Sequence, residues 1–153
     1  MKRYLTVFAL MVVLLGSLIA QPALAGGVGY VDFEFLFNNH PEYEMKNQEL
    51  QEAADRLVAE FQAEASSLGE DANLDELRAQ YESRLDAIRE ELELFLINSV
   101  RKAIAEVAAA NEIDVVLLPG VIVYGGVNLT PLVLEALYQS YGISVPSHLR
   151  TGI

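Results

Sequence analysis

Apolar residues recur every seven positions along the middle of this chain. One series joins Tyr43, Leu50 and Leu57, and an intermediate series joins Ala54, Phe61 and Leu68. Residues 74–99 repeat the pattern, with Leu74, Tyr81, Ile88 and Phe95 in one series and Leu77, Leu85, Leu92 and Ser99 in the other. Alternating steps of three and four are typical of a coiled-coil seam. We therefore predict two long helices paired through a seam that includes Leu50, Leu57, Phe61, Tyr81, Ile88 and Phe95.

Helix-breaking residues are confined to one short stretch between the two periodic segments. Residues 66–73 read Ser-Ser-Leu-Gly-Glu-Asp-Ala-Asn, and Gly69 is the only glycine or proline between residues 42 and 112. Glycine and small polar residues favour turns. The sequence therefore predicts a helical hairpin over 42–112 with its tip at 66–73. Charged and small residues fill the outer faces, which indicates helices that stay largely in water.

Short apolar segments flank the predicted hairpin on both sides. Residues 27–33 are expected as a strand and residues 34–37 as a helical turn, and Pro41 suits the first position of the next helix. After the hairpin, Asn111 is expected as a left-handed helix cap. Residues 113–118 and 121–124 are expected as strands, with Pro119-Gly120 as the turn between them.

The last segment is expected to be a helix whose cap is Thr130 and whose first residue is Pro131. The fold class is thus α+β, with a long projecting α-helical hairpin on a small β body made of residues 26–41 and 113–153. A body of 57 residues buries too little surface to be stable by itself and leaves strand edges open. We expect several copies to assemble through it, and a body that packs only within one chain is the alternative.

The first 25 residues have the three-part layout of a secretory signal peptide. Lys2 and Arg3 precede an apolar run, and the small-residue pattern Ala23-Leu24-Ala25 follows Pro22. A run of roughly 16 apolar residues is short of the ~20 needed to span a bilayer. We therefore expect cleavage after Ala25 and export, with an uncleaved membrane anchor as the alternative.

The net charge of the exported chain limits the classes of partner that it can bind. The full sequence has a formal charge of −12, and without Lys2 and Arg3 the mature chain keeps 8 basic against 22 acidic residues, a charge of −14. Such a charge argues against nucleic acid, lipopolysaccharide and anionic membranes as partners. His40 and His148 lie far apart and there is no cysteine, so we expect His40 to cap a helix or face solvent, and we expect no metal site.

Catalytic and nucleotide-binding patterns are not found in the sequence. No phosphate-binding loop or nucleophile elbow occurs. Carboxylate pairs such as Glu60/Glu64 share a helix face in contact with water, whereas acid–base catalysis needs a sheltered pocket. We therefore expect neither an enzyme nor a bound cofactor.

Several segments, taken in order, resemble the Skp/OmpH family of periplasmic chaperones. They are Gly29-Tyr30-Val31-Asp32, Asn39-His40-Pro41, the charged helical hairpin, Asp114-Val115-Val116-Leu117, and Val123-Tyr124-Gly125-Gly126-Val127-Asn128-Leu129-Thr130 before a Leu-rich helix. The similarity covers essentially the whole predicted mature chain. It implies a homotrimer with a small β-barrel body, to which each subunit contributes strands, and three coiled-coil tentacles around a cavity.

The resemblance also implies a function. Members are ATP-independent holdases in the periplasm, which bind unfolded outer-membrane proteins and prevent their aggregation. Met45 and Val58, which fall outside the predicted seam, are candidates for contact with such clients. This chain departs from the basic, longer tentacles of well-known members, because residues 42–112 contain 18 acidic and 7 basic residues. A structural or adaptor protein of the cell envelope, whose coiled-coil arms bind one folded partner, is the alternative function.

Overall fold

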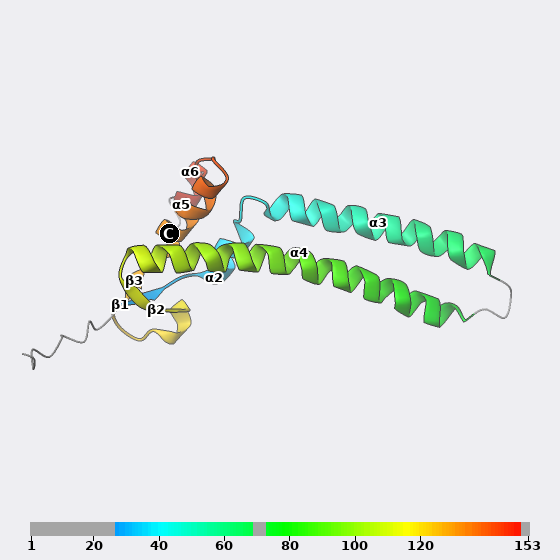
Figure 1. Ribbon diagram of the computed structural model, residues 1–153, viewed down its shortest axis with the longest axis horizontal. Helices are drawn as coiled ribbons and strands as arrows, with labels where there is room; N and C mark the ends of the chain where they lie inside the picture. Colours follow the sequence, from blue (N-terminus) through cyan, green and yellow to red (C-terminus); the bar gives the residue numbers. More distant parts are fainter. Residues whose placement is uncertain (1–26, 69–72, 151–153) are drawn as a thin grey trace, which may run out of the picture.

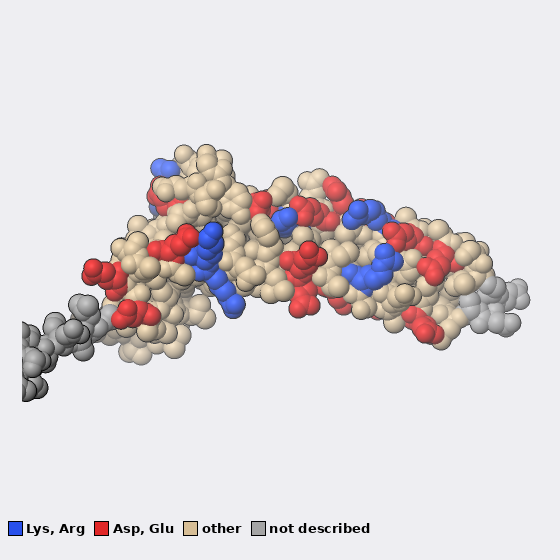
Figure 2. Space-filling model, in the orientation of Figure 1, with Lys and Arg blue, Asp and Glu red and all other residues tan. Residues whose placement is uncertain are grey.

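Two long helices, α3 (Tyr43–Ser67) and α4 (Leu74–Ala110), dominate a mixed α+β fold (Figure 1). The computed structural model describes residues 27–68 and 73–150, so the predicted signal peptide and residues 69–72 of the predicted tip lie outside the described residues. The two helices run antiparallel and side by side away from a small body (Figure 1). Figure 2 shows the same elongated outline in space-filling form.

The helix ends follow the sequence prediction with two local differences. The side chain of Asn73 accepts the Glu76 N–H at 3.2 Å and so caps α4, within the predicted tip. Helix α3 begins at Tyr43 and not at Pro41, because the Tyr43 N–H bonds to the His40 carbonyl at 2.9 Å and residues 41–42 form a turn. The left-handed residue after α4 is Glu112 (φ 56°), whereas Asn111 keeps a negative φ.

Asn111 was expected to be left-handed, and its own hydrogen bonds explain why it is not. Its backbone N–H still bonds to the carbonyls of Val107 and Ala108, and its side-chain amide donates to the Val107 carbonyl at 2.8 Å. The residue is therefore held against the last turn of α4. The change of chain direction falls on the next residue, Glu112.

The sheet has three parallel strands, with β1 (Gly27–Tyr30) between β2 (Ile113–Leu117) and β3 (Val127–Asn128). The strand predicted at 113–118 is confirmed as β2, but the strand predicted at 121–124 is wrong, and β2 pairs with β1 and not with a following strand. Residues Pro119–Val121 form a short 3-10 helix, η1, and the third strand comes later in the chain. The first strand also stops at Tyr30, and the predicted helical turn is α2 (Phe33–Asn38), which is capped by Asp32.

Two side chains near the start of α5 (Thr130–Ser140) explain why β3 forms at residues 127–128. Leu129 is fully buried in the core, and its N–H bonds to the Tyr30 carbonyl at 2.9 Å. The Thr130 hydroxyl accepts the Asp32 N–H at 2.9 Å, while the Asn128 side chain accepts the Thr130 N–H at 3.0 Å. Thr130 therefore does not cap its own helix, as the sequence suggested, but fixes α5 to the junction between β1 and α2.

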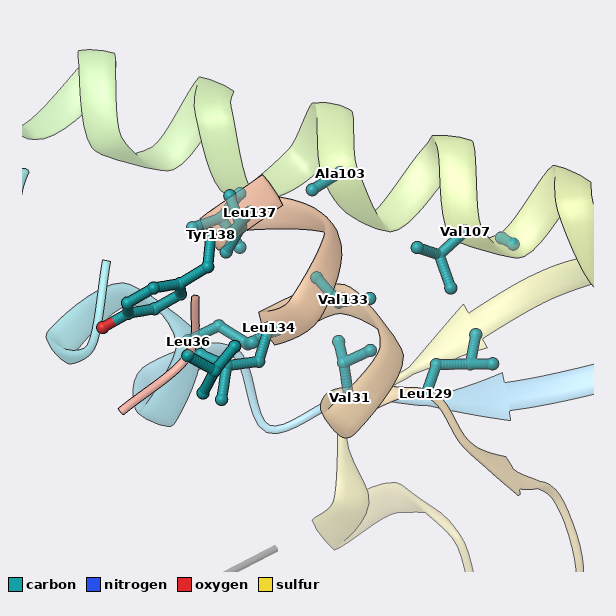
Figure 3. Close-up of a cluster of buried hydrophobic side chains, with 12 residues drawn as sticks. Val31, Leu36, Ala103, Val107, Leu129, Val133, Leu134, Leu137 and Tyr138 are labelled. Carbon is teal, nitrogen blue, oxygen red and sulfur yellow. The ribbon is translucent and has the colours of Figure 1, made fainter. Parts of the chain in front are cut away.

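One hydrophobic core lies where α2, α5 and the sheet gather around the C-terminal half of α4 (Figure 3). Its buried side chains come from α2, α4, α5 and the adjoining links, and Ile113 and Val116 of β2 pack against them. A four-residue helix, α6 (Ser147–Arg150), follows α5 and adds Leu149 to the edge of the core. The core consists of Val31, Leu36, Val100, Ala103, Val107, Ala108, Leu129, Val133, Leu134, Leu137, Tyr138 and Val145.

Two leucines of α5 differ in burial, because Leu134 lies in the core and Leu132 on the exposed side of the helix. We expect Leu134→Ala to lower the free energy of unfolding by about 2–5 kcal/mol, because it leaves a cavity in the core. Leu132→Ala, on the exposed side of the same helix, should change it by less than about 0.5 kcal/mol. Urea unfolding followed by circular dichroism at one fixed protein concentration measures both. Equal losses in the two variants would contradict this placement of the core.

Candidate functional site

The interface between α3 and α4 is thin. Among the described residues of the two arms, those fully buried are Ala53, Leu57 and Leu77, with Leu96 buried at the base. Of the predicted seam residues, Leu57 is buried, whereas Leu50, Phe61, Tyr81 and Ile88 are half-buried. Most of the surface of both helices therefore faces water.

Polar side chains connect the two helices in the outer half of the hairpin. The Phe61 and Tyr81 rings meet edge to face, with centroids 5.7 Å apart. The Tyr81 hydroxyl donates to Glu64 at 2.8 Å, which raises the pKa of the phenol, and Arg84 pairs with Glu60 at 2.9 Å. The Glu60/Glu64 pair therefore binds α4 side chains across the hairpin. The sequence indicated a solvated face here and gave no sign of these partners.

Apolar side chains are exposed along the hairpin in addition to those in its interface. Met45 and Val58, singled out from the sequence because they lie outside the seam, are both exposed in the structure. Phe95, Leu68 and Leu74 were expected along the seam but are 44%, 42% and 46% exposed. We call the exposed apolar residues of the hairpin the arm patch, which consists of Met45, Val58, Leu68, Leu74, Leu94 and Phe95.

The exposure of Phe95 has a geometric cause. At its level on α4 the facing segment is the first turn of α3, which begins only at Tyr43. The ring of Phe95 has the His40 ring on one side, at 6.5 Å between centroids, and the Lys46 ammonium 4.8 Å from its own centroid. The seven-residue repeat continues through Phe95, but no second apolar helix face lies opposite to cover it fully.

Acidic side chains surround the arm patch. Figure 2 shows Asp and Glu spread along the hairpin, with fewer Lys and Arg between them. Four ion pairs connect Lys46, Arg84, Arg89 and Lys102 to carboxylates of the same hairpin. Residues 42–112 contain 18 acidic and 7 basic residues, so this region carries a large excess of negative charge.

The body exposes a second apolar surface around the short helix η1. Val123 and Tyr124 are almost entirely exposed, although both have large apolar side chains. The outer edges of β2 and β3 pair with no other strand among the described residues. We call this surface the body patch, which consists of Val28, Val115, Leu118, Val121, Val123, Tyr124 and Val127.

A groove of about 1040 Å³ lies beside the body patch. Helix α4 forms one wall with Ile104 and Ala108, and β2 forms another with Val116. The groove is lined mainly by apolar side chains, and its charged lining residues are Asp32, Glu34, Arg101 and Asp114.

The described residues hold no cluster of three or more His, Asp or Glu side chains that could bind a metal ion. None of the described helices combines the length and apolar character needed to cross a bilayer. The exposed apolar surfaces described above are the arm patch and the body patch. No known family model and no curated protein sequence matches this chain.

Two neighbouring residues test how the hairpin interior differs from its surface. Leu57→Ala should lower the free energy of unfolding by about 2 kcal/mol, because Leu57 is 7% exposed between the helices. Val58→Ala should change it by less than about 0.5 kcal/mol, because Val58 is 54% exposed and alanine favours a helix. Chemical unfolding of both variants provides the measurement. A larger loss for Val58→Ala would mean that the two faces of α3 are assigned the wrong way round.

Proposed function

We propose that this chain is an exported, ATP-independent holdase chaperone of the Skp/OmpH type, which binds unfolded outer-membrane proteins in the periplasm and prevents their aggregation. One observation carries the proposal, the arm patch. Its apolar side chains are exposed on helices whose own interface is already filled by Leu57, Leu77 and their neighbours. They are therefore available for a partner.

The arrangement of the arm patch suits a client without fixed structure. Met45 and Leu94 lie towards the base of the hairpin, whereas Leu68 and Leu74 lie at its tip, so the apolar sites are spread along the arms. Each site offers a small contact without directional requirements, and many such contacts on one chain add up through multivalency. Between them, the carboxylates keep the empty chaperone in solution.

The body patch supports assembly into a trimer. A three-stranded sheet with two open edges, flanked by exposed Val123 and Tyr124, favours association with further copies. In the proposed assembly, three bodies form a β-barrel-like core, and three helical hairpins project from it as coiled-coil tentacles around a cavity. The excess of acidic residues on these tentacles favours clients with basic segments and disfavours lipopolysaccharide.

Suppression of aggregation tests the holdase function. Protein produced from the full sequence should reduce light scattering when a urea-unfolded outer-membrane β-barrel is diluted, without ATP. Replacing Met45, Val58, Leu94 and Phe95 by serine should raise the concentration required at least about fivefold, because each buried apolar side chain contributes on the order of 1 kcal/mol.

A matched variant controls for the loss of helix propensity in that experiment. It carries serine at the exposed positions Asn47, Gln62, Ala79 and Gln80 and should suppress aggregation like the parent. Absence of suppression at every ratio and salt concentration would refute the holdase function. Stoichiometric capture of one folded protein, with no binding of unrelated unfolded barrels, would favour the envelope adaptor instead.

Molar mass tests the proposed assembly separately. Light scattering coupled to gel filtration should give the mass of three chains. Replacing both Val123 and Tyr124 by aspartate should give one chain, because charges would have to be buried between bodies. Val58→Asp, in the arm, should keep three. A parent protein that is a monomer at all concentrations would remove the enclosing geometry.

A further inference from the structure

A buried histidine joins three parts of the molecule at the base of the hairpin. His40 is 3% exposed, although the sequence indicated a cap or a solvent-facing residue. Its ring nitrogens bond to the start of α3 and to α4, and its ring lies edge to face against Tyr141, just after α5, at 5.5 Å between centroids. Neither the predicted fold nor the proposed function gives this histidine a role.

The hydrogen bonds of His40 fix which ring nitrogen carries the proton. Nδ1 lies 3.1 Å from the backbone nitrogen of Glu42, and a backbone N–H can only donate, so Nδ1 must be the acceptor. The proton of the neutral ring is therefore on Nε2, which donates to the Ser99 hydroxyl at 2.8 Å. This arrangement requires neutral imidazole.

Glu42 takes part in a second hydrogen bond, through its side chain. The Tyr141 hydroxyl donates to the Glu42 carboxylate at 2.8 Å, and the Tyr141 ring packs against His40, so His40 bonds to the backbone of Glu42 and Tyr141 bonds to its side chain. Together with the bond between His40 and Ser99, these contacts form a polar network that links the start of α3 to α4 and to the end of α5. The Tyr141–Glu42 bond attaches the base of α3 to the end of α5, and the Tyr43 ring packs edge to face against Phe37 of α2 at 5.8 Å between centroids.

Protonation of His40 would break one bond of this network, the bond from the Glu42 N–H to Nδ1. A charged imidazole carries protons on both nitrogens, so the Glu42 N–H would then face a donor and lose its acceptor. The charge would also sit among the rings of Phe95 and Tyr141 with little access to water. Accordingly, burial lowers the pKa of His40, and the neighbouring carboxylate of Glu42 opposes that shift only in part.

The other charged or polar groups near His40 are Glu42, Lys46, Tyr141 and Ser99. Lys46 lies over the Phe95 ring, which separates it from His40, and forms an ion pair with Glu49 at 2.9 Å. Burial raises the pKa of Tyr141, so its hydroxyl stays protonated at neutral and acidic pH. Helix α4 faces His40 with Ser99 and Phe95, which carry no charge.

We propose that His40 is a pH-sensitive latch, which fixes the base of α3 to α4 and to the end of α5 when its ring is neutral and releases it when the ring is protonated. The unfolded or released chain binds the proton more readily, because the pKa of His40 is lowered in the closed form. The latch is therefore closed above about pH 6.5 and opens as the pH falls below that value. This inference does not depend on the holdase function.

Spin-label distances test the latch directly, since the chain has no cysteine of its own. Cysteines at the exposed positions Asn47 and Glu93 report on the base of the hairpin, and cysteines at Ala59 and Ser83 report on its middle. The labelled chain is diluted into unlabelled chain so that only distances within one copy are measured. Between pH 7.5 and pH 5.0 the base distance should lengthen and broaden, while the middle distance should stay unchanged.

Three variants assign the change to His40. In His40→Asn the side-chain oxygen can still accept the Glu42 N–H, two residues on, but it cannot titrate, so the pH step should disappear. Glu42→Gln removes the carboxylate that stabilises the charged ring in the closed form, so the closed form tolerates the proton less and the midpoint should move to higher pH. His148→Gln, at the other histidine of the chain, should leave the midpoint unchanged.

Proton resonances of the imidazole rings give an independent readout. In the parent chain the titration of His40 should have the same midpoint as the change in base distance. A base distance that is equal at both pH values would overturn the latch. A pH step that persists in His40→Asn would also overturn it, whatever the outcome of the aggregation experiments.

Discussion

Helix α4 is the constraint on which the rest of the structure depends, because one continuous element serves both the body and the hairpin. Its 37 residues correspond to about 55 Å. The C-terminal half buries Val100, Ala103 and Val107 against α5, α2 and β2, whereas the N-terminal half buries little beyond Leu77. The direction of this arm is therefore fixed by the packing of the core. Helix α3 has no comparable extension into the core, so its position depends on the thin interface with α4, on the contact of Tyr43 with Phe37 and on the polar network around His40.

The two halves of the fold differed in how far the sequence could predict them. The spacing of apolar residues predicts a long helix well, because such a helix buries one stripe of side chains wherever it packs. Helices α3 and α4 accordingly begin and end close to the predicted limits. Strand identity depends on pairing as well. Residues 121–124 have high strand propensity, yet β1 pairs with Val127 and Asn128, where burial of Leu129 and the Thr130–Asp32 hydrogen bond fix the register. No local pattern carries that information.

A similar division applies to the candidate site. Met45 and Val58 could be found from the sequence because the seven-residue repeat separates seam positions from the remaining ones. Phe95 could not, since the repeat does not say where the opposing helix begins. His40 could not either, because its partners Ser99 and Tyr141 are 59 and about 100 residues away and become neighbours only through the tertiary fold. An Asn-His-Pro sequence before a helix indicates a cap, and the Nδ1 bond to Glu42 is a contact of that kind.

Charge is concentrated on the hairpin, whereas most of the body patch lies in an uncharged stretch of the chain. This difference affects where two copies could meet. Residues 115–134 contain no charged side chain and include most of the body patch, whereas residues 42–112 contain 18 acidic and 7 basic residues. Two bodies in contact through the body patch bring few like charges together. Two hairpins side by side repel each other within a Debye length of about 8–10 Å. Association is therefore least opposed at the body, and in the proposed trimer the same repulsion would keep neighbouring arms apart and leave the apolar side chains between the carboxylates open to a client.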